Sequence, residues 1–159
     1  MFMQLKEEKR DLFSVNNEKD MWYVQCISAD FACGKGIALE FNKRGDVKNL
    51  LMKNYKKNMW NGYGYCLPTC SLPETNEDRE YFKVFNLVTK AKYYMKPSER
   101  TIRTALMSLH DMVKAYGIKK MAMPQIGCGL DRMDWNNVRE IIQHIFQDIQ
   151  DLEILVCRK

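Results

Sequence analysis

The chain has 159 residues, of which 46% are hydrophobic and 28% charged, and its formal net charge is +5. This length suits one domain with its own core, here residues 1–159, and the composition is that of a soluble globular protein rather than a disordered or fibrous one. There is no run of 18 apolar residues, and the N-terminus, "MFMQLKEEKRD", is charged. A membrane span and a signal peptide are therefore not expected. We expect a monomer in the cytoplasm, with the nucleus as an alternative if the organism is eukaryotic.

The six cysteines favour reduced thiols over disulfides. Cys26 and Cys157 lie in apolar, strand-like runs, and Cys128 lies between two glycines. Cys66 and Cys70 form a C-x3-C pair, but neither a second pair nor a nearby histidine completes a zinc site. Neither a metal nor a cofactor is predicted.

The net charge of +5 favours an anionic partner, but it is too small and too spread along the chain to indicate nucleic acid. The densest basic stretch, residues 48–60, is interpreted as an amphipathic helix with Leu50, Leu51 and Tyr55 facing inward. A DNA-binding helix is the weaker alternative.

Hydrophobic periodicity places strands and helices along the chain. Alternating or continuous apolar runs predict strands at 22–28, 64–69, 80–89, 120–126 and 152–158. Helical spacing and capping signals predict helices at 36–43, 46–57, 98–116 and 134–148. The stretch before Asp11, "MQLKEEKRD", is too polar to be assigned as a strand with the same assurance.

This order of elements predicts a three-layer α/β/α domain with a central mixed sheet, whose middle strands form a hairpin around "LPETNEDRE". In such sheets ligands bind beyond the carboxyl ends of the strands. The loops after residues 28, 89 and 126 are therefore the places where a site is expected.

Two of these loops contain paired glycines. In "SADFACGKGIALEF", Gly34 and Gly36 flank Lys35 at the start of a helix, where backbone N–H groups and the helix dipole favour a phosphate. In "GCG", Gly127 and Gly129 can form an anion-binding backbone nest. Each motif alone also fits a simple turn, but two such loops at one sheet edge favour two phosphates or a diphosphate.

Two ionisable residues accompany the loops. Lys90 ends the predicted strand at 80–89, and Asp131 follows the second glycine loop. Taken by itself, the position of Lys90 favours a solvated lysine over a functional one. Asp131 by itself also fits a helix-start carboxylate that interacts with the dipole or with Arg132.

The segments "RDLF", "QCISADFACGKGIA", "VTK" and "MPQIGCGLDRMDWNNV" together resemble the macrodomain family over about residues 8–159. They are most similar to its terminal ADP-ribose protein glycohydrolase branch, which removes ADP-ribose from acidic side chains. The common macrodomain asparagines after the second strand are missing from "CISAD", which favours the lysine-dependent branch.

The resemblance implies an ADP-ribose site and assigns its residues. It implies that Lys90 is the nucleophile and Asp131 the acid/base. Asp11 and Leu12 would contact the adenine, with Lys159 close to it. The remaining implied ligand contacts are Ser28, Gly34, Gly36, Ile37, Ala38, Thr89, Gln125, Ile126, Gly127, Cys128, Gly129 and Leu130.

The implied reaction needs no metal. A neutral Lys90 amine would attack the anomeric carbon of the distal ribose, or the aldehyde of the opened sugar, and Asp131 would take and return the proton.

The implied partners are ADP-ribose and ADP-ribosylated proteins, with ADP-ribosylated nucleic acid as a further possibility. Alternatives are a non-catalytic ADP-ribose reader and a hydrolase of small derivatives such as O-acetyl-ADP-ribose. A nucleophilic Cys128 thiolate is disfavoured, because the loop serves to present backbone N–H groups.

Overall fold

In this computed structural model, residues 2–15, 20–71 and 81–158 are described. The chain alternates between strands and helices as the periodicity predicts. The elements in chain order are β1 (Gln4–Lys9), the short 3-10 helix η1 (Leu12–Val15), β2 (Met21–Ser28), α1 (Gly36–Gly45), α2 (Val47–Asn54), β3 (Tyr65–Ser71), β4 (Phe82–Lys90), α3 (Glu99–Tyr116), β5 (Lys120–Met123), α4 (Trp135–Phe146) and β6 (Glu153–Arg158).

The strands form one six-stranded mixed sheet in the order β1-β6-β5-β2-β4-β3. All neighbouring pairs are parallel except β3 with β4, which is antiparallel, as the predicted hairpin requires. The tip of that hairpin, residues 72–80, lies outside the described residues. Because β1, β6, β5, β2 and β4 all run the same way, their carboxyl ends lie along one edge of the sheet.

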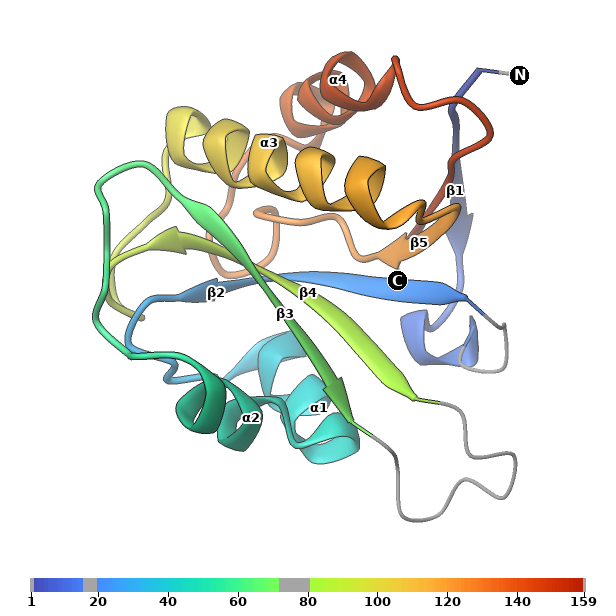
Figure 1. Cartoon of the computed structure of the whole chain (residues 1–159). Coiled ribbons are helices and arrows are strands. Elements are labelled where there is room, and N and C mark those ends of the chain that lie inside the picture. Colours follow the sequence, from blue (N-terminus) through green and yellow to red (C-terminus); the bar gives the residue numbers. More distant parts are fainter. Residues whose placement is uncertain (1, 16–19, 72–80, 159) are drawn as a thin grey trace.

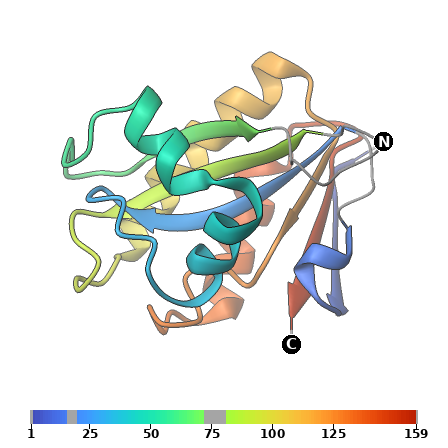
Figure 2. The same cartoon turned by 90° about the horizontal axis from the view of Figure 1, so that it is seen from below.

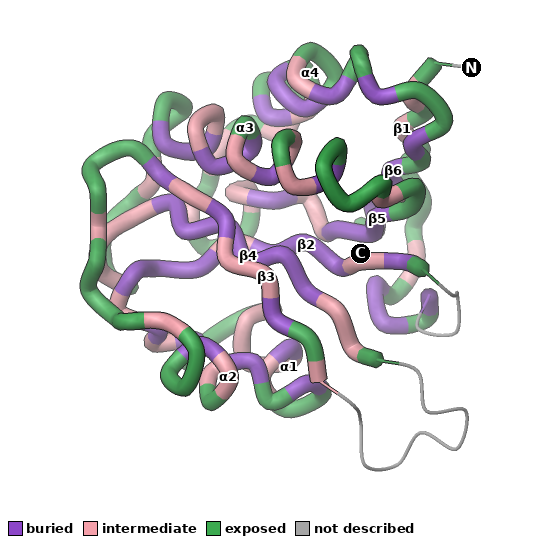
Figure 3. Tube along the Cα trace, viewed as in Figure 1, coloured by how far each residue is buried: buried purple, intermediate pink, exposed green. Residues whose placement is uncertain are grey.

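Helices cover both faces of the sheet, which confirms the three-layer α/β/α prediction (Figures 1 and 2). Helices α3 and α4 pack on one face, and α1 and α2 cover the β2, β3 and β4 part of the other. Two apolar clusters fill these interfaces, one centred on α3 and α4 and the other on α1, α2 and η1. The buried residues follow the two layers along the chain trace (Figure 3).

Strand β1 is the element that sequence patterning identified least well. Five of its six residues are exposed, and Leu5 alone is partly buried. The strand lies at the edge of the sheet, where pairing with β6 supplies its backbone hydrogen bonds. An edge strand can therefore be polar on both faces, which removes the alternation that sequence analysis relies on.

Helix α2 ends three residues before its predicted end. Tyr55 has an extended backbone, its hydroxyl donates to the Pro68 carbonyl at 2.7 Å, and the Asn58 N–H donates to the Ala29 carbonyl at 2.7 Å. These tertiary contacts draw the chain away from the helix axis. Lys56 and Lys57, predicted to lie on a helix, are therefore in an irregular segment that contacts the loop after β2.

Strand β5 also ends earlier than predicted. It stops at Met123, because Pro124 cannot donate a ladder hydrogen bond, and residues 125–130 form turns. Gln125 and Ile126 thus belong to the loop. None of the helices in the described ranges is long and apolar enough to cross a membrane.

Candidate active site

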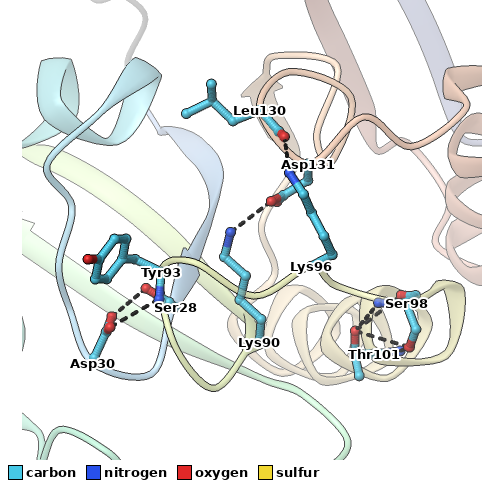
Figure 4. A network of polar contacts seen from close by, with 9 residues as sticks. All are labelled: Ser28, Asp30, Lys90, Tyr93, Lys96, Ser98, Thr101, Leu130 and Asp131. Atoms are coloured by element: carbon cyan, nitrogen blue, oxygen red, sulfur yellow. Dashed lines mark hydrogen bonds and ion pairs between the residues drawn. The ribbon is translucent and has the colours of Figure 1, made fainter.

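Lys90 and Asp131 face each other at the carboxyl edge of the sheet. The Lys90 Nζ atom donates to Asp131 Oδ1 at 2.7 Å, and the two side chains point toward each other from the end of β4 and from the loop before α4 (Figure 4). Their side chains are only 14% and 12% exposed. An ion pair so shielded from water places an amine and a proton acceptor in direct contact, which is the arrangement that an activated amine nucleophile requires.

The first glycine loop runs from the end of β2 to the start of α1. Lys35 is the N-cap of α1, and its side chain makes no capping hydrogen bond. The first N–H groups of a helix have no partner within the helix, so this end is open to an anion. Ile37 and Ala38, in the first turn, pack against the core behind the loop. Gly36 has φ of +60°, a conformation that favours glycine.

Two non-glycine residues share this unusual backbone. Phe31 and Cys33 have φ of 54° and 48° although both side chains are buried. Left-handed conformations cost a non-glycine residue about 1 kcal/mol or more, and such strain gathers where a loop is held in one functional shape. The loop is therefore pre-formed by core packing of its side chains, a feature that the glycine pattern alone did not predict.

Asp30 holds the first loop against the segment that follows Lys90. Its carboxylate accepts hydrogen bonds from the Ser28 hydroxyl and from the Tyr93 N–H at 3.0 Å (Figure 4). It also accepts one from the Ala32 N–H at 3.2 Å. Burial by itself would raise the pKa of Asp30, but these hydrogen bonds hold it below its ordinary value. Sequence analysis missed Asp30, although an Asp two residues after a strand-ending Ser is a signal for a side-chain-capped turn.

The second glycine loop closes on itself before α4. The Cys128 N–H donates to the Gln125 carbonyl at 3.2 Å, and the Met133 N–H donates to the Gly127 carbonyl at 2.7 Å. Gly127 has φ of +74°, and a Cβ atom there would lie 2.8 Å from the Ile102 side chain. The turn therefore favours glycine at position 127, and a side chain there would also displace the end of the Ile102 side chain.

Leu130 joins the two glycine loops. A Cβ atom at Gly36 would lie 3.4 Å from Leu130 Cδ1, so the second loop reaches across to the start of α1. The Leu130 carbonyl accepts a hydrogen bond from Lys96 Nζ at 2.5 Å (Figure 4). The structure therefore brings together Gly36, Lys90, Leu130 and Asp131, as predicted, and adds Lys96, whose partner is too far along the chain for a sequence signal.

Gly34 and Gly129 have no need to be glycine within the folded chain. Both lack a positive φ; a Cβ atom at Gly129 would meet nothing within 4 Å, and one at Gly34 only the Ala32 carbonyl at 3.8 Å. Both residues are exposed at the site. Glycine at these two exposed positions leaves room for a ligand to approach the backbone closely.

The residues implied for adenine lie at the same sheet edge but farther along it. Asp11 follows β1, which is separated from β2 by β6 and β5, or about 14 Å at ordinary strand spacing. Its carboxylate accepts from the Phe13 N–H at 3.1 Å and so caps η1. Leu12 is 4% exposed and packs in the core, so little of it is open to a ligand. Lys159 lies outside the described residues.

Several implied contacts are buried. Ser28, Thr89 and Ile126 are at most 5% exposed, and Ile126 packs in the core. The Thr89 hydroxyl has no hydrogen-bond partner in the part of the chain that the structure describes. Gln125 and Cys128 are partly buried beside them.

The thiols around the site are protonated at neutral pH. Burial raises the pKa of Cys128 to about 11, and Asp134 adds to the rise. Burial likewise raises the pKa of Cys26 to about 12, with a further rise from the Asp131 carboxylate, so Cys26 lies near the lysine–aspartate pair. Cys128 donates to the Ile126 carbonyl at 3.3 Å, which fits a packing role rather than a thiolate nucleophile.

This site is distinct from a hollow of about 160 Å³ on the open face of β1, β5 and β6. Lys6, Glu8, Lys120 and Glu153 contribute to its lining, and none of the predicted site residues does. Within the described residues, no cluster of His, Cys, Asp and Glu is arranged to hold a metal ion.

The fold and site define a class: an α/β/α domain that presents two glycine loops beside a shielded lysine–aspartate pair at the carboxyl edge of a mixed sheet. The chain belongs to the Macro domain family, whose model matches residues 24–142.

Curated relatives match this chain over most of its length. The chain is 32% identical over 149 residues to the ADP-ribose glycohydrolase OARD1 of Bos taurus. That match covers 93% of this chain and 87% of the relative. It is 25% identical over 147 residues to the DNA ADP-ribosyl glycohydrolase of Mycobacterium tuberculosis. That match covers 92% of this chain but only 40% of the relative. Among solved structures, the macrodomain of Mycobacterium tuberculosis DarG superposes with a TM-score of 0.76 at 19% identity and covers 97% of each chain.

Proposed function

We propose that this protein hydrolyses ADP-ribose linkages and removes mono-ADP-ribose from glutamate and aspartate side chains through a lysyl–ADP-ribose intermediate. The observation that carries the proposal is the 2.7 Å contact between Lys90 and Asp131, placed between two glycine loops. The relationship to a protein named ADP-ribose glycohydrolase supports the hydrolase part of the proposal.

The diphosphate of ADP-ribose would lie between the loops. The uncapped start of α1 offers backbone N–H groups from one side, and Gly34 and Gly129 leave space for close approach. Within the described ranges, the Gly129 and Leu130 N–H groups donate to no protein acceptor, so both are free to meet a phosphate oxygen. The distal ribose would then reach the Lys90–Asp131 pair.

The proposed reaction has two steps. Asp131 takes a proton from the Lys90 ammonium, and the neutral amine attacks the anomeric carbon as the bond to the carboxylate oxygen breaks, so that the modified side chain leaves as a carboxylate. Water then adds to the same carbon as the carbon–nitrogen bond breaks, and the proton that water loses passes to the solvent. The proton held by Asp131 returns to the lysine, which regains its ammonium form. The products are ADP-ribose and an unmodified acidic residue.

The first experiment follows release of ADP-ribose from a glutamate-modified protein by the wild type and by Lys90→Ala, with ADP-ribose binding measured by calorimetry on both. We expect release by the wild type alone and binding by both within about tenfold, because the loops rather than Lys90 hold the diphosphate. Binding without release by the wild type would make the protein a reader, or an enzyme for small derivatives such as O-acetyl-ADP-ribose.

A further inference from the structure

The positive charge of the protein is concentrated beside the candidate active site. Residues 55–63 and 91–100 contain five basic residues and one acidic residue, a net +4 of the chain's +5. The first segment follows α2 and the second follows β4, so both lie at the carboxyl edge of the sheet (Figure 1). We call the five basic side chains the basic rim: Lys56, Lys57, Lys92, Lys96 and Arg100.

Direct contacts hold the two segments side by side. Lys92 Nζ donates to Asn58 Oδ1 at 2.8 Å, and the Arg100 guanidinium lies 4.7 Å from the centroid of the Tyr63 ring. Asn58 is also bonded through its N–H to Ala29, in the loop after β2. The charges that looked dispersed along the sequence therefore form one surface next to Lys90.

The acidic groups around the rim do not neutralise it. Asp131 is paired with Lys90, Glu99 is paired with Arg103 at 3.2 Å, and Asp30 is engaged by three hydrogen bonds. In the described ranges, no basic-rim residue lies within ion-pair distance of a carboxylate, although Lys92 contributes from farther away to the low pKa of Asp30. The rim thus presents uncompensated positive charge to a ligand.

Two exposed tyrosines border this surface. Tyr93 and Tyr94 are 61% and 71% exposed, and their rings form an edge-to-face pair with centroids 5.3 Å apart at 87°. Asp30 fixes the Tyr93 backbone. Phenolic hydroxyls can donate to carboxylates. Perpendicular rings, by contrast, do not form the series of parallel faces on which successive bases of a single strand stack.

We propose that the basic rim binds the polypeptide that carries the ADP-ribose and selects modified residues within acidic segments. The inference rests on the proposed function, because the carrier chain would leave the site past Lys90 and over the rim. Carboxylates flanking the modified residue would then meet Lys56, Lys57, Lys92 and Arg100. Such rim charges act mainly on the encounter rate and are weakened by salt.

The test compares two peptides that carry ADP-ribose on the same glutamate, one flanked by four acidic residues and the other by four serines or glutamines. The quantity measured is kcat/KM at low and high ionic strength, for the wild type and for a Lys56→Glu/Lys57→Glu variant. The matched control is Lys6→Glu/Lys9→Glu, which reverses two exposed charges on β1. Thermal unfolding verifies that both variants fold.

We expect the wild type to prefer the acidic peptide by about tenfold at low salt and less at high salt. The preference should vanish in Lys56→Glu/Lys57→Glu and persist in the control. Equal turnover of both peptides by the wild type would overturn the inference while leaving the proposed function intact.

If neither peptide is hydrolysed, the proposed function fails, and calorimetric binding of the two peptides to Lys90→Ala decides the inference separately. Equal binding overturns it, and tighter binding of the acidic peptide supports it. A rim-dependent preference for an ADP-ribosylated single-stranded oligonucleotide over the acidic peptide would also overturn the assignment to a polypeptide.

Discussion

Two acid–base contacts in this protein have nearly the same length but different surroundings. Lys90 Nζ and Asp131 Oδ1 are 2.7 Å apart, and His110 Nε2 and Asp148 Oδ1 are 2.8 Å apart. In the first pair both side chains are shielded, whereas the Asp148 side chain is 47% exposed. The first lies among ligand-binding loops, and the second joins α3 to the residues after α4.

The difference shows that contact geometry alone does not identify a catalytic pair. His110 also contacts Asp111 at 3.0 Å, and Lys114 contacts Asp148 at 3.5 Å, so that cluster is a saturated surface network. The Lys90–Asp131 pair is instead flanked by uncapped N–H groups and by glycines that leave space. A catalytic pair needs room for a substrate next to it, and a stabilising pair does not.

The largest effect should come from removing the proton acceptor. We expect Asp131→Asn to lower kcat by about 100-fold or more, because an amide cannot take the lysine proton. Mass spectrometry should detect ADP-ribose attached to Lys90 if the second step is the one that stalls. His110→Asn, which disrupts the other pair, is the control and should leave kcat within about twofold. A similar loss of activity in both variants would remove the distinction between the pairs.

A smaller effect is expected from the Lys96 contact to the Leu130 carbonyl, next to Asp131. Lys96→Met should lower kcat about threefold to tenfold, because an exposed charge-assisted hydrogen bond is worth about 1 kcal/mol and positions the acid/base residue. Lys96→Arg should retain most of the activity. A rise in KM with kcat unchanged would instead indicate that Lys96 only binds substrate.

The His110 cluster should affect stability rather than activity. Burial by itself would lower the pKa of His110, but its hydrogen bonds to Asp111 and Asp148 raise it above the ordinary value. A raised folded-state pKa stabilises the folded chain below the unfolded pKa of about 6.5, and this contribution is lost as pH rises through the folded-state value.

We therefore expect His110→Asn to lower the free energy of unfolding by about 0.5–1 kcal/mol at pH 5.5 and by less at pH 9, as measured by urea titration. His144→Asn, which alters the exposed histidine of α4, is the matched control. A deficit that grows with pH would contradict the assignment.

The smallest effect is expected at Cys128. Its thiol is protonated and donates to a backbone carbonyl, so Cys128→Ser should keep kcat/KM within about twofold. Loss of activity by 100-fold with ADP-ribose binding intact would show that the thiol, rather than Lys90, is the nucleophile.

The sequence by itself determined the layered fold and the positions of both glycine loops. Apolar runs at β2, β4 and β6 and the amphipathic patterns of α3 and α4 are local signals of burial, and the parallel order follows from their alternation. The edge of the sheet where Lys90 and Asp131 meet follows from the same order. Residue roles within the site came from motif resemblance and remain predictions.

Only the tertiary structure decided which residues are neighbours across the chain. The edge position of β1, the bond from Asp30 to the Tyr93 backbone and the Lys96–Leu130 contact all depend on partners dozens of residues away. The early end of α2 depends on contacts with Pro68 and Ala29, outside the helix. The same holds for the basic rim, whose charges are divided between two segments. Local patterns report burial and backbone preference, but the meeting of distant polar groups depends on how the layers pack.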